Sequence, residues 1–176
     1  MVMIIRRYDI PISYRWYEIV MEIDVQSHVR KIYLDSALVI EDNAYKLIDR
    51  RIDIEGKKVL IADCSEKLDY VVTVDDKPLA AHIEDHSKIY STWEVTLPGG
   101  AKTKVVANRK SELETVYFRG KKLPGLTRTS ILSGFWKLEW SYQEVEFKIE
   151  FRLEGTWSET LVMNKCIVPQ FKPSTG

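Results

Sequence analysis

The chain has few of the features that mark secreted, membrane-spanning or catalytic proteins. Two cysteines occur in 176 residues, Cys64 and Cys166, one in each half. Small secreted β-domains usually carry cysteines in pairs within one domain, and separate halves would exclude an intradomain disulfide. Arg6 and Arg7 directly follow the apolar residues 1–5, which is too short a run for a signal peptide. No apolar run approaches the roughly 20 residues that a membrane helix requires. We therefore expect a soluble, cytoplasmic protein with no membrane insertion.

Net charge is absent as well, because 26 Lys and Arg balance 26 Asp and Glu. This balance argues against nucleic acid or an anionic membrane as the partner. The charges are split unevenly: residues 1–90 carry 13 basic and 17 acidic residues, whereas residues 91–176 carry 13 and 9 and contain no Asp. Such a split would allow a weak attraction between the halves, or between two copies in a weak homodimer. Drift between two solvated surfaces is the simpler explanation, since screened surface charges contribute little.

Catalytic and metal-binding motifs are also missing. The 8 glycines form no phosphate-binding loop, and no nucleophile elbow or metal-spaced cysteine pair is present. His82 and His86 are the strongest candidates, because residues four apart share one face of a helix and could bind zinc with a carboxylate. The alternative is two surface histidines on a polar connector. Ser87 beside His86 would suggest a nucleophile and its base, but sequence neighbours rarely have the required geometry. We expect no catalytic site, no metal and no cofactor, and a metal hydrolase is the weakest hypothesis.

Surface tryptophans would support a different function. Trp136, Trp140 and Trp157 lie in segments that the sequence predicts to be strands, and together they could form a platform for carbohydrate or peptide. Tryptophan in a small sandwich is more often part of the core. Glu146 and Glu150 could contribute to a carboxylate pair for glycoside hydrolysis, but they lie on the charged face of an alternating strand, where solvation explains them. A ligand-binding β-sandwich is therefore the alternative to a protein-interaction module.

Alternating hydrophobicity predicts β-strands along most of the chain. Residues 145–153 place five apolar side chains on one face and four charged ones on the other, as a strand with one buried and one solvated face does. The turn at residues 55–58 lies between two apolar runs and indicates a hairpin. Residues 78–86 start with proline and contain two alanines, which allows a short helix. Further strands are expected over residues 17–25, 30–35, 44–49, 51–54, 59–62, 70–74, 90–97, 102–108, 113–118, 136–140 and 157–163.

The two halves contain similar segments in the same order. The pairs are 8–12 with 93–97, 29–34 with 113–118, 44–47 with 135–138, and 69–74 with 157–162. Their offset is too long for solenoid repeats, which have periods of about 20–50 residues, and it fits two small domains. We predict an all-β fold of two tandem antiparallel β-sandwich domains, residues 1–89 and 90–176, related by internal duplication and joined by a short helical or turn connector. A single large barrel is the alternative, and residues 171–176 are expected to be a frayed tail.

Several segments resemble those of one known family. Residues 74–79 (Val-Asp-Asp-Lys-Pro-Leu) and 84–88 (Glu-Asp-His-Ser-Lys) precede Thr92-Trp93. These segments resemble the N-G-K-x-L, E-D-[RK]-S-K and T-W segments of the Fas apoptotic inhibitory molecule family. Residues 120–123 are similar to that family's N-G-K-K-L segment, and residues 161–169 to its closing L-x-V-D-x-x-x-I-P. The E-D-x-S-K…T-W segment is the most specific of these.

The chain also departs from the family pattern. Asp75-Asp76 replaces N-G, His86 stands where Arg or Lys is usual, and His82 stands where an aromatic residue is usual. Because the family uses no histidine here, the resemblance weakens the zinc hypothesis. What the resemblance implies is a cytosolic, non-enzymatic protein of two β-sandwiches that binds other proteins, either signalling proteins or misfolded clients. The family protects against death-receptor apoptosis and against stress-induced protein aggregation.

The matched segments supply the candidate partner-binding or interdomain residues, which are Lys77, Glu84, Asp85, Ser87, Lys88, Trp93, Lys121 and Lys122. One interpretation is structural: Asp85 or Ser87 caps a turn, Lys88 pairs across the joint, and Trp93 anchors the second core. The other is that the connector is a partner-binding epitope. Lys121 and Lys122 form a basic pair at a turn, where solubility is the simplest role.

Overall fold

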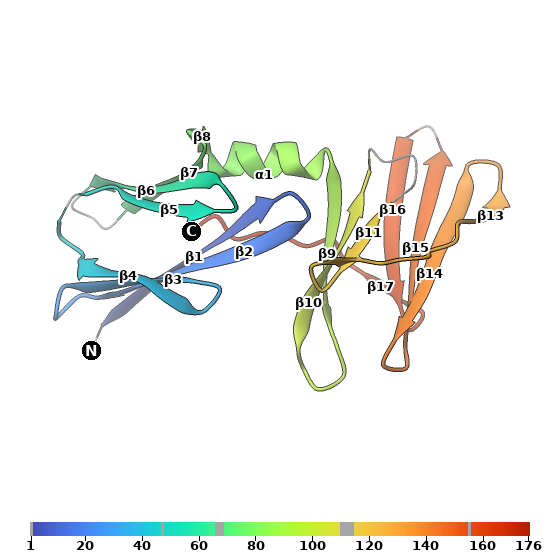
Figure 1. The fold of residues 1–176 in the computed structure, drawn as a ribbon, viewed down its shortest axis with the longest axis horizontal. Helices are drawn as coiled ribbons and strands as arrows, with labels where there is room; N and C mark the ends of the chain where they lie inside the picture. The colour runs from blue at the N-terminus through green and yellow to red at the C-terminus, as the bar shows by residue number, and fades with distance from the viewer. Residues whose placement is uncertain (1, 47, 66–68, 110–114, 155) are drawn as a thin grey trace. The chain divides into compact units, whose positions relative to one another are not determined.

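The computed structural model describes residues 2–46, 48–65, 69–109, 115–154 and 156–176, which form seventeen strands and one short helix. This confirms the all-β prediction. The chain divides into two compact units, Met1–Ser87 together with Lys172–Gly176, and Lys88–Phe171 (Figure 1). Each unit contains two separate antiparallel sheets, in place of one closed sheet. No helix in the described part of the chain has the length and apolar character needed to cross a bilayer.

The first unit is a sandwich of two four-stranded sheets, with the sheet of β5–β7 lying over that of β1–β4 in Figure 1. Its strands are β1 (Met3–Ile12), β2 (Arg15–Asp24), β3 (Val29–Leu34) and β4 (Ala37–Asn43), then β5 (Arg50–Ile54), β6 (Lys57–Ser65), β7 (Asp69–Val74) and β8 (Lys77–Pro78). Ile10, Ile19 and Ile32 from the first sheet and Val59 and Ile61 from the second are almost completely buried in one core. This core is built as a sandwich requires, from alternate residues of both sheets.

The predicted helix is present as α1 (Leu79–Ser87), directly after β8. Leu79 is buried and Ile83 packs against the first core, so the short apolar side of α1 faces the sandwich. α1 contacts β1 and β7. The helix therefore belongs to the first unit, where it covers one end of both sheets.

The second unit repeats the two-sheet plan. One sheet is formed by β9 (Tyr90–Thr96), β10 (Lys102–Asn108), β11 (Val116–Phe118) and β12 (Lys121–Lys122), and the other by β13 (Thr129–Leu132), β14 (Phe135–Tyr142), β15 (Val145–Glu154), β16 (Thr156–Met163) and β17 (Cys166–Val168). Phe147, Ile149 and Phe151 of β15 are buried, which confirms the alternation predicted from the sequence. Leu153, at the far end of the same face, is 56% exposed and lies outside the core.

The sequence predicts a strand at residues 44–49, and this prediction is wrong. Residues 44–46 form a turn, and residues 48–49 lie outside any strand. The strand lies earlier, as β4 (Ala37–Asn43). The Asn43 side chain accepts a hydrogen bond from the Tyr45 amide at 2.9 Å, and the Asn43 carbonyl accepts one from the Lys46 amide at 3.3 Å. Asparagine stabilises turns in this way, by bonding the backbone two residues on.

Two-residue turns join many of the strands and explain a departure from the family pattern. Asp75 and Asp76, which connect β7 to β8, have φ values of 47° and 65°, and Arg119 and Gly120, which connect β11 to β12, have 53° and 70°. Two consecutive positive φ values define the hairpin turn that Asn-Gly adopts most readily. The Asp75 carboxylate also accepts a hydrogen bond from the Lys58 amide at 2.9 Å. Asp75 and Asp76 therefore adopt the turn conformation that Asn-Gly favours, although neither residue is Asn or Gly.

The C-terminal residues, expected to be a frayed tail, are held by both units. In the second unit, the Phe171 amide donates to the Thr92 carbonyl at 2.9 Å, beside a bridge between Trp93 and Gln170. Ser174 lies in the first unit and exchanges hydrogen bonds with Asp9: the Asp9 amide donates to the Ser174 carbonyl at 2.9 Å, and the Ser174 amide donates to the Asp9 carboxylate at 2.7 Å. The frayed-tail prediction was wrong because these bonds join residues far apart in sequence.

The duplication inferred from the sequence stays a prediction. Residues 69–74 lie on β7 and residues 157–162 on β16, and each of these strands is followed by a short edge strand. The match between residues 44–47 and 135–138 does not correspond to equivalent elements. Residues 44–46 lie in a turn and residue 47 is outside the described residues, whereas residues 135–138 lie within β14. The sheets also differ, since the last sheet of the second unit has five strands rather than four.

A buried ion-pair network joins the two sheets of the first unit. Arg30 on β3 is 1% exposed, donates to Asp42 on β4 at 2.9 Å, and reaches Asp63 on β6 at 3.1 Å and the Tyr70 hydroxyl at 3.3 Å. Arg50 on β5 also pairs with Asp42. Burial alone would lower the pKa of Arg30, but the hydrogen bonds to Asp42 and Tyr70 outweigh it and raise that pKa above its usual value. The guanidinium therefore stays charged, and both sheets depend on it.

The second unit has a smaller network of the same kind. The Glu159 side chain on β16 is 1% exposed. It accepts hydrogen bonds from the Ser91 hydroxyl on β9 at 3.0 Å and from Arg109 at 2.9 Å. Ser91 and Glu159 belong to different sheets, so a buried carboxylate links the two layers here as Arg30 does in the first unit.

Removing Arg30 should destabilise the first unit strongly. Arg30→Ala removes the arginine that bonds both Asp42 and Asp63 and leaves Arg50 to pair with them, and breaking a buried pair in this way costs about 3–5 kcal/mol. Arg7→Ala is the matched control, since it removes an exposed pair with Glu18 and should cost less than about 1 kcal/mol. Urea unfolding followed by circular dichroism measures both. Equal costs for the two variants would contradict the structural role of the network.

Trp93 gives the corresponding test for the second unit, because it is 1% exposed in the core. Trp93→Ala should lower the free energy of unfolding by about 3–5 kcal/mol, as truncation of a large buried aromatic side chain does. Ile167→Ala, at a side chain that is 73% exposed, is the control and should be nearly neutral. Thermal and urea unfolding followed by far-ultraviolet circular dichroism measure the change. A near-neutral Trp93→Ala would mean that the side chain is available for binding instead.

Candidate functional site

The outer edge of β1 is the feature around which the first unit's candidate residues are arranged. β1 pairs with β2 over its whole length, so alternate residues direct their backbone groups away from β2. His82 and His86 of α1 contact this outer edge: the Nε2 atom of His82 lies 2.7 Å from the Pro11 carbonyl, and that of His86 lies 2.8 Å from the Ser13 carbonyl. One helical turn separates the two histidines, so they reach Pro11 near the end of β1 and Ser13 in the turn that follows β1. The histidine pair therefore caps the end of a strand edge.

His86 is held neutral by this arrangement. Its side chain is 8% exposed, and its ring meets the Trp16 ring edge-on with centroids 5.1 Å apart. Burial lowers the pKa of His86 from 6.5 to about 4, against a smaller opposing effect of the hydrogen bond to Ser13. A neutral imidazole whose Nε2 carries the hydrogen is the form that can donate to a carbonyl.

This geometry gives no support to the zinc and nucleophile hypotheses. The Nε2 atoms of both histidines face backbone carbonyls rather than each other or a carboxylate. The described residues contain no group of three or more His, Cys, Asp or Glu side chains arranged to bind a metal ion. The Ser87 hydroxyl donates to the Glu84 carbonyl at 2.7 Å, within its own helix. Ser87 thus stabilises the end of α1, as a short polar side chain at a helix terminus does.

The other connector residues are distributed between the two units. Lys77 on β8 pairs with Asp85 on α1, and both side chains are partly exposed. Asp85 lies within the helix, so it does not cap the start of a turn. Glu84 is exposed on the same helix, whereas Lys88 is exposed and begins the second unit.

Trp93, Lys121 and Lys122 all lie in the second unit. Trp93 is in the centre of β9, paired with Val105 of β10, with its side chain in the core. Lys121 and Lys122 form β12 at the edge of the same sheet, and both side chains are exposed. The eight candidate residues therefore include a core anchor, a partly exposed ion pair on α1 and β8, and a basic edge.

The surface-tryptophan platform is not formed by the described side chains. Trp136 is 6% exposed and stacks on Phe151 with ring centroids 5.8 Å apart. Trp140 is partly buried and stacks on Phe147 at 5.1 Å. The side chain of Trp157 lies outside those described. The two described tryptophans face the core, as tryptophan in a small sandwich usually does.

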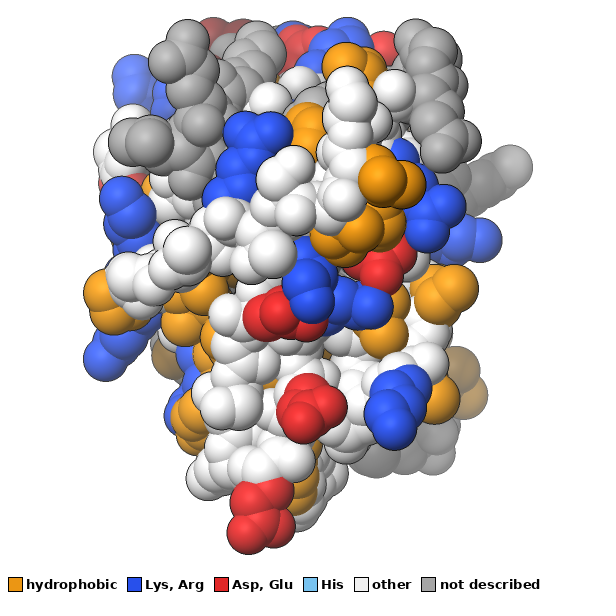
Figure 2. Space-filling view, turned by 90° about the vertical axis from the view of Figure 1, so that its right-hand side faces the viewer, with side chains coloured by type: hydrophobic (Ala, Val, Ile, Leu, Met, Phe, Trp, Pro, Cys, Tyr) orange, Lys and Arg blue, Asp and Glu red, His pale blue; other side chains and the backbone are white. Residues whose placement is uncertain are grey.

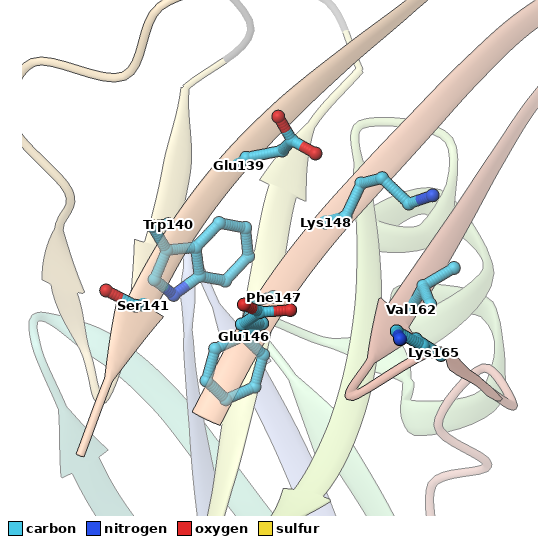
Figure 3. A pocket seen from close by; sticks show the side chains of 8 residues that line it. All are labelled: Glu139, Trp140, Ser141, Glu146, Phe147, Lys148, Val162 and Lys165. Atoms are coloured by element: carbon cyan, nitrogen blue, oxygen red, sulfur yellow. The ribbon is translucent and has the colours of Figure 1, made fainter. Parts of the chain in front are cut away.

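A shallow hollow of about 470 Å³ lies on the solvent face of β14–β16. Figure 3 shows Glu139, Lys148 and Val162 on this face, while the ring of Trp140 lies at its side. Lys148 pairs with Glu150 at 2.6 Å, and Lys137 pairs with Glu139 at 2.8 Å. Charges of both signs also intermingle over the end of the second unit that Figure 2 shows. Neighbouring charges neutralise one another here, which suits a solvated face better than a catalytic pair.

Sequence analysis missed the partners that position the site. Pro11 and Ser13 attract no notice as residues, because their carbonyls, not their side chains, meet the histidines. Ser174 was placed in the frayed tail, yet its hydroxyl donates to the Arg7 carbonyl at 2.8 Å on the same edge of β1. The spacing of His82 and His86 is the available signal in the sequence, because it places both histidines on one face of α1, but it does not identify the two carbonyls as their partners.

The pKa of His86 predicts a loss of stability in acid. Above pH 6.5 the imidazole is neutral in both states, so its contribution is constant. Between pH 6.5 and about 4 the unfolded chain takes up a proton that the folded chain does not, so stability falls, by about 3 kcal/mol in total. His86→Gln should remove this part of the pH dependence, while His28→Asn, at an exposed histidine, should retain it. Urea unfolding between pH 7 and 4 measures it, and parallel curves for the wild type and His86→Gln would contradict the assignment.

Comparison with known proteins identifies the family. A search of curated proteins and a search of solved structures each found no match. A family model described as Fas apoptotic inhibitory molecule (FAIM1) matches residues 4–131. The matched residues include β1 except Met3, the whole of α1, and the first sheet of the second unit. It covers more than half of the chain, and the protein therefore belongs to the Fas apoptotic inhibitory molecule family.

Proposed function

We propose that this protein is a non-enzymatic, cytoplasmic interaction module that protects cells by binding other proteins. The protection would act against death-receptor apoptosis, against stress-induced protein aggregation, or against both. The partners would be signalling proteins or misfolded clients. The observation that carries this proposal is the family match over residues 4–131.

The sheets of the protein offer surfaces suited to such binding. Edge strands present unpaired backbone groups, which another extended chain can use for pairing. β4 is an edge strand on which Leu38 and Val39 are 50% and 43% exposed, and β13 is an edge strand on which Ile131 and Leu132 are 43% and 69% exposed. Exposed apolar side chains on free edges favour contact with partly unfolded chains, which expose the same kinds of group.

The alternative of a carbohydrate- or peptide-binding sandwich loses its main support. Its binding platform needed exposed tryptophans, and Trp136 and Trp140 are instead stacked on core phenylalanines. A metal hydrolase is likewise unsupported, because His82 and His86 are engaged with backbone carbonyls.

An aggregation assay tests the proposal directly. At equimolar or lower amounts, the protein should slow the light scattering of several heat-stressed client enzymes, relative to an unrelated β-sandwich at equal mass. A variant with Glu84→Lys, Asp85→Lys and Lys88→Glu tests whether the connector is the epitope, and a variant with Lys121→Glu and Lys122→Glu is its matched control. Loss of protection in the connector variant alone would place the epitope on that segment. No protection of any client by the wild type would contradict the anti-aggregation role.

A further inference from the structure

The outer edge of β1 is covered over one half and open over the other. Ser174 bonds the backbone of Arg7 and Asp9, and the histidines of α1 bond Pro11 and Ser13. These contacts show that the odd-numbered residues direct their backbone groups outward. By the same alternation, the amides and carbonyls of Met3 and Ile5 also point outward. Among the described residues, no hydrogen bond reaches these groups.

The open half has the regularity needed for pairing with another strand. β1 and β2 pair without a register shift from Met3 to Ile12. Two other edges with exposed apolar side chains are less regular, because the pairing of β4 with β3 shifts at Ile32/Tyr33 and that of β13 with β14 shifts at Ser130/Leu132. Bulges of this kind twist an edge and hinder strand addition. The Met3–Arg7 part of β1 lacks this protection.

The side chains beside the open edge define the chemistry of a partner. Val2, Met3 and Ile5 are 58%, 37% and 50% exposed. Met3 lies opposite Asp24 and Ile5 opposite Glu22, so these pairs share the solvent face of the sheet. A hollow of about 320 Å³ opens on this face, and its lining residues are Met3, Glu22, Asp24, Ser27, Val29, Lys31 and Glu41. Three carboxylates against one lysine favour a partner that brings apolar contact together with positive charge.

We propose that the Met3–Arg7 edge of β1 binds an extended segment of a partner protein by antiparallel strand addition, and that the segment alternates apolar residues with Lys or Arg. The C-terminal tail indicates the direction of the added strand, since Thr175 already pairs antiparallel with Tyr8 on the same edge. An added strand would continue this pairing toward Met3. Its backbone would pair with Met3, Ile5 and the Arg7 amide. Its basic side chains would lie on the solvent face, with their aliphatic stems against Met3 and Ile5 and their charges toward Glu22 and Asp24. Its apolar side chains would lie on the opposite face, beside the partly buried Ile4. The inference rests on the proposed function and specifies the kind of client segment that is bound.

Ile5→Pro is the decisive variant. Proline at position 5 removes an outward amide but no amide of the β1–β2 pairing, and Pro11 already occupies an equivalent outward position on the strand. A fluorescein-labelled nonapeptide of alternating lysine and valine is the probe, titrated at low salt and followed by anisotropy. Ile5→Pro should weaken its binding about tenfold or more, since strand addition loses a backbone hydrogen bond and the strand shape that supports it. Ile5→Val keeps the amide and should bind as the wild type does.

The charge contribution is tested by exposed or partly exposed residues whose replacement leaves the fold intact. Glu22→Gln together with Glu41→Gln should weaken the lysine–valine peptide severalfold and reduce the salt dependence of its binding. A nonapeptide of alternating glutamate and valine should bind at least about tenfold more weakly to the wild type. This test remains valid if Ile5→Pro fails to fold.

Amide hydrogen exchange shows where on the protein the peptide binds. The lysine–valine peptide should slow exchange at Met3, Ile5 and Arg7, whose amides point outward, and leave the inward amides of Ile4 and Arg6 unchanged. Protection elsewhere, or peptide binding that neither Ile5→Pro nor the charge variant weakens, overturns the proposal. So does a peptide-independent dimer in sedimentation that Ile5→Pro abolishes, because the edge would then bind a second copy. Peptide binding at β1 without any protection of heated clients would refute the anti-aggregation role and leave this site standing. Protection that survives Ile5→Pro would support that role and overturn this edge as the place where clients bind.

Discussion

The first unit is organised by the need to satisfy the backbone groups along the outer edge of β1. An edge strand presents donors and acceptors that must be paired, covered or left to water. Two segments distant in sequence cover most of this edge: α1 contributes His82 and His86, and the C-terminal tail contributes Ser174. The helix directly after β8 and the C-terminal tail both meet this requirement. Among the described residues, the outward backbone groups of Met3 and Ile5 and the Arg7 amide are left open.

Each sandwich also depends on a charge placed between its two sheets. Arg30 in the first unit and Glu159 in the second are nearly inaccessible, and each bonds side chains from the opposing sheet. The carboxylates of Asp42 and Asp63 face Arg30, whereas a hydroxyl and one arginine face Glu159. Such pairs contribute less to net stability than to fixing a unique alignment of the layers, since a shifted sheet would leave a buried charge unpaired. The two units therefore share a plan while differing in the sign of the central charge.

The proposed binding of other proteins is supported both by membership of the family and by the geometry of β1. A protein that binds other chains needs backbone or apolar surface that its own fold has not used. Here the apolar side chains of the strands are largely buried in two separate cores, and Trp93 and Trp136 are among them. Among the described residues, the edge strands β1, β4, β13 and β17 all carry exposed apolar side chains. The hairpin turns fix the strands at these edges, and Asp75 and Asp76 adopt the conformation of Asn-Gly in the turn that leads to β8.

The sequence by itself determined the β-rich fold, the division of strands by turns, and the family. Residues 145–153 alternate strictly, and their period matches the pleat of a strand, so a local pattern was sufficient. The short helix after Pro78 followed from local propensity in the same way. The tertiary structure alone decided that Asn43 ends β4 in a turn, that His86 is buried against Ser13 rather than near a metal, and that Ser174 is anchored to Asp9. These outcomes depend on backbone groups brought together from distant parts of the chain, and a backbone carbonyl has no identity in the sequence.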